Sequence, residues 1–386
     1  MSCAAVLPVA RPAFEVADIV RDFGAAFRRE RALTPEQAEV FRAITACRTS
    51  ALGGHLDVCN RCGFSQPSYN SCRNRHCPKC QGAAQRAWIN ERAKRILPVG
   101  HFHVVFTVPD VLHRLAAFRR EEVFAALFAA ASETLLELGI SRLGADLGFT
   151  MVLHTWTRDL RFHPHVHAIV SAGGPSLDGS QWLSHPRFLL PVRVLGAVFR
   201  GKMLDEIRRL HARGAFAGFD AFLDPDGFDR LMARLAKKRW VVYAKRPFGR
   251  PEHVLAYLGR YTHRVGISNH RIVARHGDLV TIATKIGTAT IHGVEFLRRF
   301  VQHVLPKRFV KIRHYGLYAS SHVDTKLAAS RAQLAALSST SDDDPSAFEG
   351  SPPDISSSPV TASRLCPQCL TGSLIEAPLP SALDSS

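Results

Sequence analysis

The chain has 386 residues, of which 46% are hydrophobic and 22% are charged, a composition typical of a globular protein with a sizeable core. Length and composition exclude collagen-like, coiled-coil and small disulfide-stabilised folds. No run reaches the ~18 to 20 apolar residues of a membrane span, and the N-terminus lacks the basic and apolar regions of a signal peptide. We therefore expect a cytoplasmic protein with reduced thiols and no membrane partner.

Charge is the unusual property of this sequence. The 50 Lys and Arg residues exceed the 33 Asp and Glu residues, for a formal net charge of +17. Residues 338–386 hold seven acidic side chains and a single basic one, Arg364, so the positive charge belongs to the rest of the chain. A body this basic attracts polyanions, of which nucleic acid is the commonest in a cytoplasm. A merely soluble basic protein is the alternative that charge alone leaves open.

Two short helices are predicted within residues 13–50. Apolar residues recur at helical spacing from Phe14 to Phe23, and Thr34-Pro35-Glu36-Gln37 has the form of a capping box with Pro at the first helical position. From Gly53 to Gln81 the composition changes to Cys, His, Asn, Gly and Arg with little apolar periodicity. Because this stretch cannot build a core of its own, something other than burial must fold it.

Cysteine spacing in that stretch predicts a zinc site. Cys59-x-x-Cys62 and Cys77-x-x-Cys80 are separated by 14 residues, near the ~15 to 20 typical of four-cysteine sites. We expect both pairs to complete one tetrahedral shell whose metal supplies the folding energy, whereas disulfides suit the compartment poorly. Three further residues are candidates for a second ion or for one of the four positions: Cys72, His76 and His55.

Two other features accompany the cysteines. The basic residues Arg73, Arg75 and Lys79 surround the expected metal, which favours a DNA-binding role. The distant pair Cys366-x-x-Cys369 is half a site with no visible partner, and both a redundant pair and a second metal stay open. The rest of residues 338–386, rich in Ser, Pro and Asp, is predicted to be disordered.

The middle of the chain predicts an α+β domain with a mostly antiparallel sheet flanked by helices, preceded by the small zinc-binding module. Expected helices, after a basic helical link at 83–96, cover residues 110–139, 194–213, 226–237 and 251–263. Expected strands cover residues 103–108, 148–156, 165–172 and 240–244, with two or three short strands in 270–300, a turn at Gly277-Asp278 and a helix after Gly293.

A histidine-rich strand predicts a second kind of metal site. In His163-Pro164-His165-Val166-His167 the imidazoles occupy alternate positions, so in an extended segment they face the same side. Uncompensated histidines in a central strand would be costly, which favours metal ligation. Either His163 or His154, from the preceding strand, is expected to join His165 and His167. Imidazoles suit Zn, Mn, Ni or Fe, while a phosphate substrate equally suits Mg or Mn as a Lewis acid.

A tyrosine pair follows about 90 residues later. Tyr257 and Tyr261 are one helical turn apart, which places both phenols on one face, ~5 to 6 Å between Cβ atoms. Such a pair more often packs in a core. Here the neighbours Arg260, His263 and Arg264 do not suit a core-facing stripe, so the pair is also a candidate for nucleophilic attack on phosphate.

These motifs together resemble the two-tyrosine HUH transposases of the insertion-sequence-91 type, in consistent order over roughly residues 15–325. The resemblance rests on the segment Asn70 to Gln81, on the HUH motif (His, bulky hydrophobic, His) at 165–167, and on the segment Tyr257 to Arg264. It implies N-terminal helices at 1–50, a zinc-binding DNA-recognition module at 51–98, a catalytic domain at 99–325 and an acidic tail at 338–386 with one CxxC.

The resemblance also implies rolling-circle transposition. A Mg²⁺ or Mn²⁺ ion held by His165, His167 and a further histidine would polarise a phosphate of single-stranded DNA, and Tyr257 or Tyr261 would form a 5′-phosphotyrosine. Arg260 and Arg264 would neutralise phosphate charge, and Zn²⁺ would be structural. The partners would be single-stranded transposon ends and target DNA at a bacterial nucleoid. Basic residues expected along the DNA strand are Lys237, Lys238, Arg239, Lys245 and Arg246.

Two other functions are compatible with these motifs. A zinc-dependent DNA-binding protein without catalysis predicts that Tyr257→Phe and Tyr261→Phe leave every activity unchanged. An HUH replication initiator or relaxase would use the same residues at a replicon origin. The zinc segment and the absence of a Walker-type Gly-x-x-x-x-Gly-Lys motif favour the transposase.

Overall fold

The computed structural model describes residues 12–93, 95–187, 189–248, 259, 266–338 and 364–379. The chain divides into two compact units, each built from separate stretches of sequence. Unit 1 comprises residues 1–82, 267–298 and 351–386, and unit 2 comprises residues 83–266 and 299–350.

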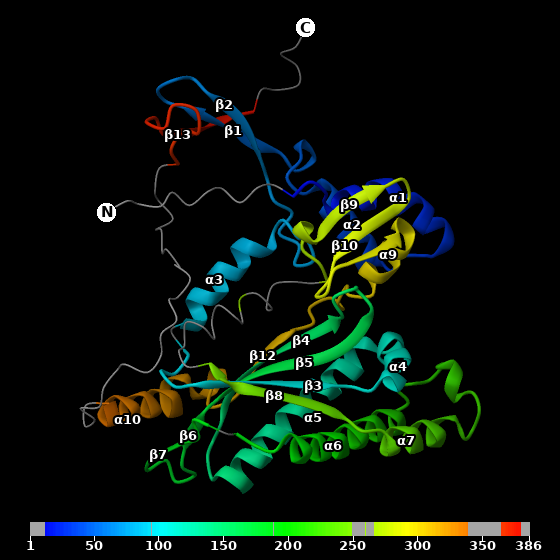
Figure 1. Cartoon of the computed structure of the whole chain (residues 1–386), viewed down its shortest axis with the longest axis vertical. Helices are drawn as coiled ribbons and strands as arrows, with labels where there is room; N and C mark the ends of the chain where they lie inside the picture. Colours follow the sequence, from blue (N-terminus) through cyan, green and yellow to red (C-terminus); the bar gives the residue numbers. More distant parts are fainter. Residues whose placement is uncertain are drawn as a thin grey trace. The chain divides into compact units, whose positions relative to one another are not determined.

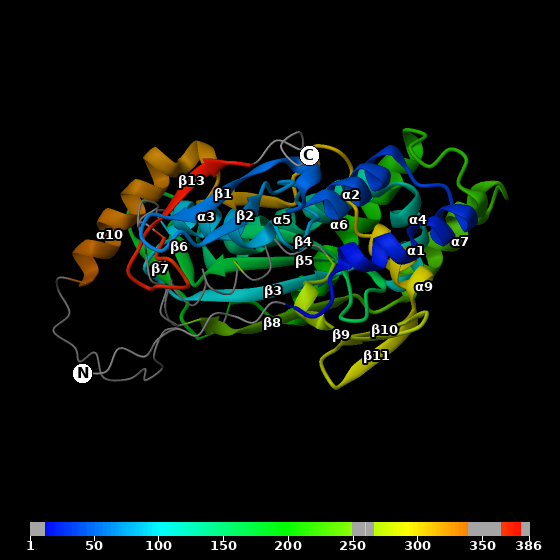
Figure 2. The same cartoon turned by 90° about the horizontal axis from the view of Figure 1, so that it is seen from above.

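Unit 1 joins helices near the N-terminus to two small sheets. Its described elements are α1 (Val16–Glu30), α2 (Pro35–Ala46), β1 (Gly54–Cys59), β2 (Ser65–Tyr69), β9 (Ile272–His276), β10 (Leu279–Ala283), β11 (Thr288–His292), most of α9 (Gly293–Val301) and β13 (Leu374–Pro378). One sheet has the order β13-β1-β2 and the other has the order β11-β10-β9 (Figure 2).

The two predicted N-terminal helices are confirmed. The side chain of Thr34 accepts a hydrogen bond from the Gln37 backbone N–H, Gln37 bonds back to Thr34, and Pro35 opens α2 as the sequence predicts. The apolar faces of α1 and α2 meet, with the rings of Phe27 and Phe41 6.1 Å apart.

Residues 267–298 pack with these helices, although the sequence analysis assigned them to the catalytic segment. The turn at Gly277 and the three short strands form as expected. The Asn269 side-chain oxygen accepts a hydrogen bond from the Val16 backbone N–H (3.1 Å), satisfying a donor at the start of α1. A Cβ at Gly293 would lie 2.3 Å from the ring of Phe23, so only glycine allows α9 to begin so close to α1.

Unit 2 is built around one five-stranded antiparallel sheet with the order β12-β4-β5-β3-β8 (Figure 1). Its strands are β3 (His101–Thr107), β4 (Gly148–Trp156), β5 (Phe162–Ser171), β8 (Val241–Phe248) and β12 (Ile312–Gly316), with β6 (Gly173–Pro175) and β7 (Trp182–Ser184) forming a separate hairpin. Its described helices are α3 (Gln81–Ala93), α4 (His113–Phe118), α5 (Arg120–Leu138), α6 (Val192–Ala212), α7 (Gly227–Lys237) and α10 (Ala328–Ser338). The predicted antiparallel α+β class is confirmed.

The main core lies between one face of this sheet and the helices α5 and α6. Alternate strand residues such as Phe106, Met151 and Val166 point into it and are fully buried. The segment Arg120–Leu143 is long and apolar enough to span a membrane, but 67% of its apolar window is buried inside the fold. Its composition therefore fits its place in the core.

Two predicted segments differ from the structure. The single helix expected over 110–139 breaks at Arg119, where the backbone leaves the helical region (φ −124°, ψ 73°) and the guanidinium donates to the carbonyl of Ala215 (2.7 Å). Residues 364–379 were expected to be disordered around their cysteine pair, but they form a turn at 367–369 and strand β13 in unit 1. The expected helix at 251–263 lies outside the described residues, except Gly259, which is helical.

A buried hydrogen-bond chain fixes the start of β3. The Nδ1 atom of His101 donates to the carbonyl of Val99 (2.8 Å), so its Nε2 atom accepts from the hydroxyl of Tyr318 (2.7 Å), which in turn accepts from the Leu97 backbone N–H (3.4 Å). Burial lowers the pKa of His101 to about 4, so the imidazole is neutral near pH 7.

We predict that Tyr318→Phe destabilises the protein by about 1–3 kcal/mol, because it leaves the buried Nε2 of His101 without a donor. Urea unfolding of the full chain measures the change. Tyr315→Phe is the matched control: Tyr315 lies on β12 with its ring stacked 5.4 Å from that of Phe149, and we expect a change within about 0.5 kcal/mol. Equal stabilities of the two variants would contradict this account of the chain.

Candidate metal centres and catalytic face

The second face of the unit 2 sheet lies away from the main core and carries several histidines beside a small apolar cluster around Val152 and Ile169. Residues opposite each other in an antiparallel pair share a face, and the registers His154↔His165 and Val105↔His167 place these side chains away from α5 and α6. Val166, between the two histidines of the HUH motif, is fully buried on the other side. We call this surface the histidine face; its histidines are His101, His103, His154, His163, His165, His167 and His314.

Three of these histidines could hold one metal ion. Ring nitrogens of His154, His165 and His167 lie within 4.8 Å of one another. His154 is buried and its ring stacks on that of Trp156 at 4.5 Å, whereas His165 and His167 are half-buried. Three protein ligands leave positions free on an ion for water or substrate, which is the arrangement of catalytic rather than structural sites.

Hydrogen bonds orient two of the three imidazoles. Nδ1 of His165 donates to the carbonyl of His163 (2.7 Å), which leaves Nε2 as the lone-pair atom. Nδ1 of His167 lies 2.8 Å from Nε2 of His103, and this bond leaves Nε2 of His167 available when Nδ1 is the donor. Burial lowers the pKa of His165 to about 4 and that of His167 well below its usual value, so both are in the neutral, ligating form near pH 7.

His163 lies at the margin of this arrangement. Its ring meets the ring of His113 edge to face at 5.4 Å and lies 5.3 Å from that of His165. Of the two candidates for the further ligand, the structure therefore brings His154 into the nitrogen cluster. The register explains why: His154 in β4 lies directly opposite His165 in β5, although the two residues are separated in the sequence.

Helix α3 covers part of the histidine face. Trp88 packs against Val152 and Ile169, which lie on that face beside the metal-ligand candidates. Gly259 approaches the same helix, since a Cβ there would lie 2.3 Å from Cδ1 of Ile89. The predicted nucleophiles Tyr257 and Tyr261 and the cations Arg260 and Arg264 lie outside the described residues, but Gly259 stands between the tyrosines in the sequence.

The cysteines of unit 1 form two groups, and their grouping differs from the single shell that spacing predicted. Within each group the Sγ atoms lie within 4.8 Å of one another. One group comprises Cys47, Cys72, Cys77 and Cys80, and the other comprises Cys59, Cys62, Cys366 and Cys369. The two CxxC pairs near the N-terminus thus belong to different groups, because β1 and β2 carry the first pair to the partner segment near residue 370.

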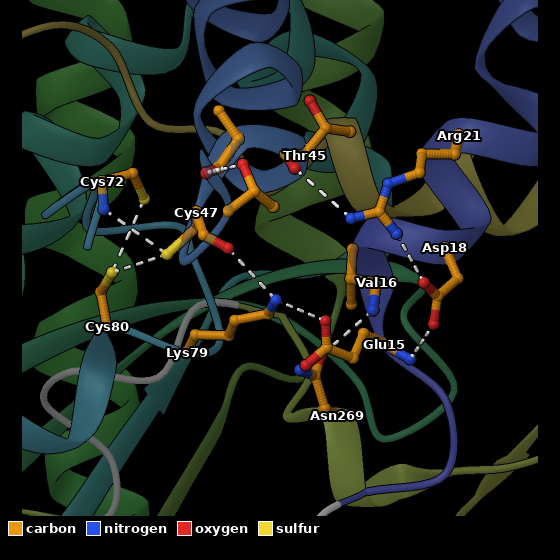
Figure 3. A network of polar contacts seen from close by, with 12 residues as sticks. Glu15, Val16, Asp18, Arg21, Thr45, Cys47, Cys72, Lys79, Cys80 and Asn269 are labelled. Carbon is orange, nitrogen blue, oxygen red and sulfur yellow. Dashed lines mark hydrogen bonds and ion pairs between the residues drawn. The ribbon is translucent and has the colours of Figure 1, made fainter. Parts of the chain in front are cut away.

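The first group fits a structural zinc ion. The Sγ atom of Cys80 lies 3.4 Å from that of Cys47 and 3.6 Å from that of Cys72; zinc–sulfur bonds of ~2.3 Å in a tetrahedron place sulfurs about 3.8 Å apart. Lys79 fixes this group to the helices: its ammonium donates to the carbonyl of Cys47 (3.2 Å) and pairs with Glu15 (2.6 Å), as Figure 3 shows.

The other predicted residues of the module have different surroundings. His55 lies 3.2 Å from a carboxylate oxygen of Asp57, and Nδ1 of the buried His76 lies 3.2 Å from the Asn74 side-chain oxygen, so neither is in a cysteine group. Arg73 and Arg75 are exposed. Among the other cations expected along DNA, Lys245 lies opposite His103 on the histidine face, and Lys238 pairs with Asp110.

Sequence reasoning missed two residues of these sites. Cys47 stands alone at the end of α2, with no CxxC partner to mark it as a ligand. His103 lies in a strand that was predicted, and its alternation with His101 was the available signal for a second histidine strand.

Comparison with known proteins gives a consistent result. The chain matches the family model described as "Putative transposase" over residues 148–326 and the one described as "Transposase zinc-binding domain" over residues 19–108. "Putative transposase y4qJ" of Sinorhizobium fredii (strain NBRC 101917 / NGR234) is 42% identical over 343 residues, 84% of this chain and 85% of the relative. "Transposase for insertion sequence element IS801" of Pseudomonas savastanoi pv. phaseolicola is 28% identical over 302 residues, 75% of this chain and 72% of the relative. No solved structure matches.

We predict that His154→Ala weakens Mn²⁺ binding at the histidine face by at least about tenfold, because it removes one of three converging ring nitrogens. Titration of the zinc-loaded protein, with free Mn²⁺ followed by electron paramagnetic resonance, measures this. His163→Ala is the matched control on the same face and is expected to bind Mn²⁺ as the unaltered protein does. The opposite ranking of the two variants would exchange their roles.

Proposed function

The chain belongs to the insertion-sequence-91 family of transposases, and we propose that it nicks and rejoins single-stranded DNA at the ends of an insertion sequence through a 5′-phosphotyrosine. The observation that carries this proposal is the histidine face, where His154, His165 and His167 converge on the side of the sheet opposite the core. Three ring nitrogens within 4.8 Å of one another suit ligation of a single ion, which packing against neighbouring side chains alone does not require.

The position of Gly259 supports the assignment of the nucleophiles. Gly259 lies midway between Tyr257 and Tyr261 in the sequence and packs on α3. Helix α3 in turn packs on the histidine face through Trp88. The chain that carries the tyrosines therefore reaches a helix that covers this face. A close glycine contact at this point limits how far residue 259 can lie from α3.

A divalent cation held by His154, His165 and His167 supplies Lewis-acid polarisation of the scissile phosphate when it is bound. The chain's own part is nucleophilic attack: the phenol oxygen of Tyr257 or Tyr261 bonds to phosphorus, the P–O3′ bond breaks, and the phenol proton ends on the 3′ oxygen that leaves. The diester energy is kept in the phosphotyrosine, so the free 3′-OH of another strand can reverse the step without an external energy source. The second tyrosine attacks the next phosphate while the first remains linked.

Positive charge near the face suits a phosphodiester substrate. Lys245 is exposed on β8 opposite His103 in the register. Burial lowers the pKa of His314 on this face to about 4, with a further contribution from the positive charges of Arg92 in α3 and of Arg95 just after it. Arg260 and Arg264, which lie on either side of Tyr261 in the sequence, are also proposed to neutralise phosphate charge.

The zinc-binding module is proposed to read the ends of the element. This module lies in unit 1 and includes Cys47 at the end of α2 as well as residues 51–82, whereas the histidine face lies in unit 2. The family matches at 19–108 and 148–326 support this division of labour. Arg73 and Arg75 are exposed beside the first cysteine group, where they can contact phosphates.

We predict that the purified, zinc-loaded protein forms a covalent adduct with labelled single-stranded DNA from the flanks of its own gene in the presence of Mg²⁺ or Mn²⁺. Denaturing electrophoresis detects the adduct as a DNA-labelled protein band. Tyr257→Phe combined with Tyr261→Phe is expected to abolish it, and His165→Ala to reduce it by at least about 10²-fold, since the loss of one ligand weakens the whole ion site.

Tyr243→Phe is the matched control, because Tyr243 is an exposed tyrosine on the histidine face outside the proposed nucleophile pair. Its adduct yield is expected to equal that of the unaltered protein. Loss of the adduct only in Tyr243→Phe would reassign the nucleophile. Tight binding of every flanking strand with no adduct would favour a DNA-binding protein without catalysis.

A further inference from the structure

The segment at residues 364–379 returns to the opposite end of the sequence. Strand β13 pairs antiparallel with β1, from His55↔Pro378 to Cys59↔Leu374, and β1 pairs with β2. Both views show β13 beside β1 and β2 (Figure 1, Figure 2). A three-stranded sheet of this size has almost no core, since its strands contain mainly half-exposed residues. Backbone hydrogen bonds in so small a sheet contribute little stability, so a further interaction is needed to hold residues 364–379 on β1.

Two CxxC turns meet at one end of this sheet. The Sγ atoms of Cys59 and Cys369 are 3.7 Å apart and those of Cys62 and Cys366 are 3.6 Å apart. The pairs are 310 and 304 residues apart in the sequence. These separations match the sulfur–sulfur distance of about 3.8 Å around a tetrahedral zinc ion and are far longer than an S–S bond of ~2.05 Å.

The turns are also built to hold thiolates. The backbone N–H of Arg61 donates to Sγ of Cys59 (3.4 Å), and that of Gly372 donates to Sγ of Cys369 (3.2 Å). Such N–H to sulfur bonds stabilise negative charge on the ligand atom. A Cβ at Gly372 would lie 2.4 Å from Sγ of Cys59, so only glycine lets the two turns approach this closely.

An ion pair between Arg364 and Asp57 also holds this segment to β1. Asp57 in β1 is 1% exposed, and both of its carboxylate oxygens accept hydrogen bonds from Arg364, at 2.6 and 3.0 Å. Arg364 is the single basic residue of the acidic stretch 338–386. The docked segment therefore supplies a guanidinium group that binds both oxygens of the buried carboxylate in β1.

We propose that Cys59, Cys62, Cys366 and Cys369 bind a second structural Zn²⁺ ion that clasps the C-terminal segment to the N-terminal module. The ion completes a zinc ribbon whose two halves come from opposite ends of the chain. Each half supplies two thiolates, which is half a tetrahedral shell, so the ion holds tightly only when both halves are present. The clasp is independent of the transposition chemistry and of the cysteine group around Cys77.

Zinc content tests the clasp. The full-length protein is expected to contain two zinc ions per chain, released by a thiol-modifying reagent and counted with a colorimetric chelator. Cys366→Ser combined with Cys369→Ser is expected to contain one. Cys3→Ser, which removes the ninth cysteine and leaves all eight cysteines of the two groups in place, is expected to contain two. One zinc in the unaltered protein, or two in the double variant, would overturn the proposal.

Gly372→Ala tests the geometry without removing any ligand. The added methyl group competes with Sγ of Cys59 for space, so the zinc content is expected to fall from two to one. Ser373→Ala is its control: the Ser373 contact with Asn60 is made by the backbone N–H and is retained, so two ions are expected. Equal zinc contents in these two variants would contradict the proposed approach of the two turns.

Fragment retention tests the clasp without relying on a variant that could misfold. A recognition site for a sequence-specific protease inserted after Ser351 allows the full, zinc-loaded protein to be cut once. The C-terminal fragment is expected to co-elute with the body in gel filtration and to separate after treatment with a zinc chelator. Separation before chelation would show that zinc does not hold the segment and would overturn the proposal.

Discussion

The two-residue period of a β-strand is the constraint on which unit 2 depends. In β5 the period sends Val166, Ala168 and Val170 into the core with α5 and α6 and sends His165 and His167 to the other face. The core therefore needs the strand to be regular, and its regularity is what aligns the imidazoles. A shift of one residue in register would bury the histidines in the core and expose Val166, Ala168 and Val170. The same register therefore determines both the packing of the core and the arrangement of the candidate metal ligands.

Unit 1 solves a different physical problem. Its polar module cannot bury enough apolar surface to fold. Binding of a metal ion by thiolates would supply the folding free energy that apolar burial does not. The grouping of ligands shows how: Cys47 directly follows α2, and Cys72, Cys77 and Cys80 lie in the loop and turn after β2, so one ion would join the helix to that loop. Lys79 reinforces this joint by bridging Glu15 at the start of α1 and the carbonyl of Cys47. The Lys79 side chain is thus a structural part of the module, in addition to any role near DNA.

Local patterns in the sequence predicted local structure well, and long-range partners poorly. The capping box of α2, the antiparallel sheet and the shared face of His165 and His167 follow from spacing over a few residues. The break at Arg119 depends on a carbonyl 96 residues away, which no local period reveals. Cysteine grouping failed for the same reason: Cys59 is three residues from Cys62 and 310 from Cys369, and spacing alone favours the nearer CxxC at Cys77. The choice of His154 over His163 required the register between β4 and β5.

The ligand sets separate two kinds of metal by chemistry. Eight described cysteines fall into two all-thiolate groups, which select zinc over harder cations because sulfur is a soft donor. The three imidazoles on the histidine face are less selective, since imidazole binds zinc, manganese or iron, and under the proposed function phosphate oxygens of a bound strand would add hard donors. Substrate and protein would then form the complete shell together, so that the preferred ion is set partly by the DNA. In that arrangement the structural ions would be held before DNA binds, whereas the affinity of the histidine face for its proposed ion would increase with the strand in place.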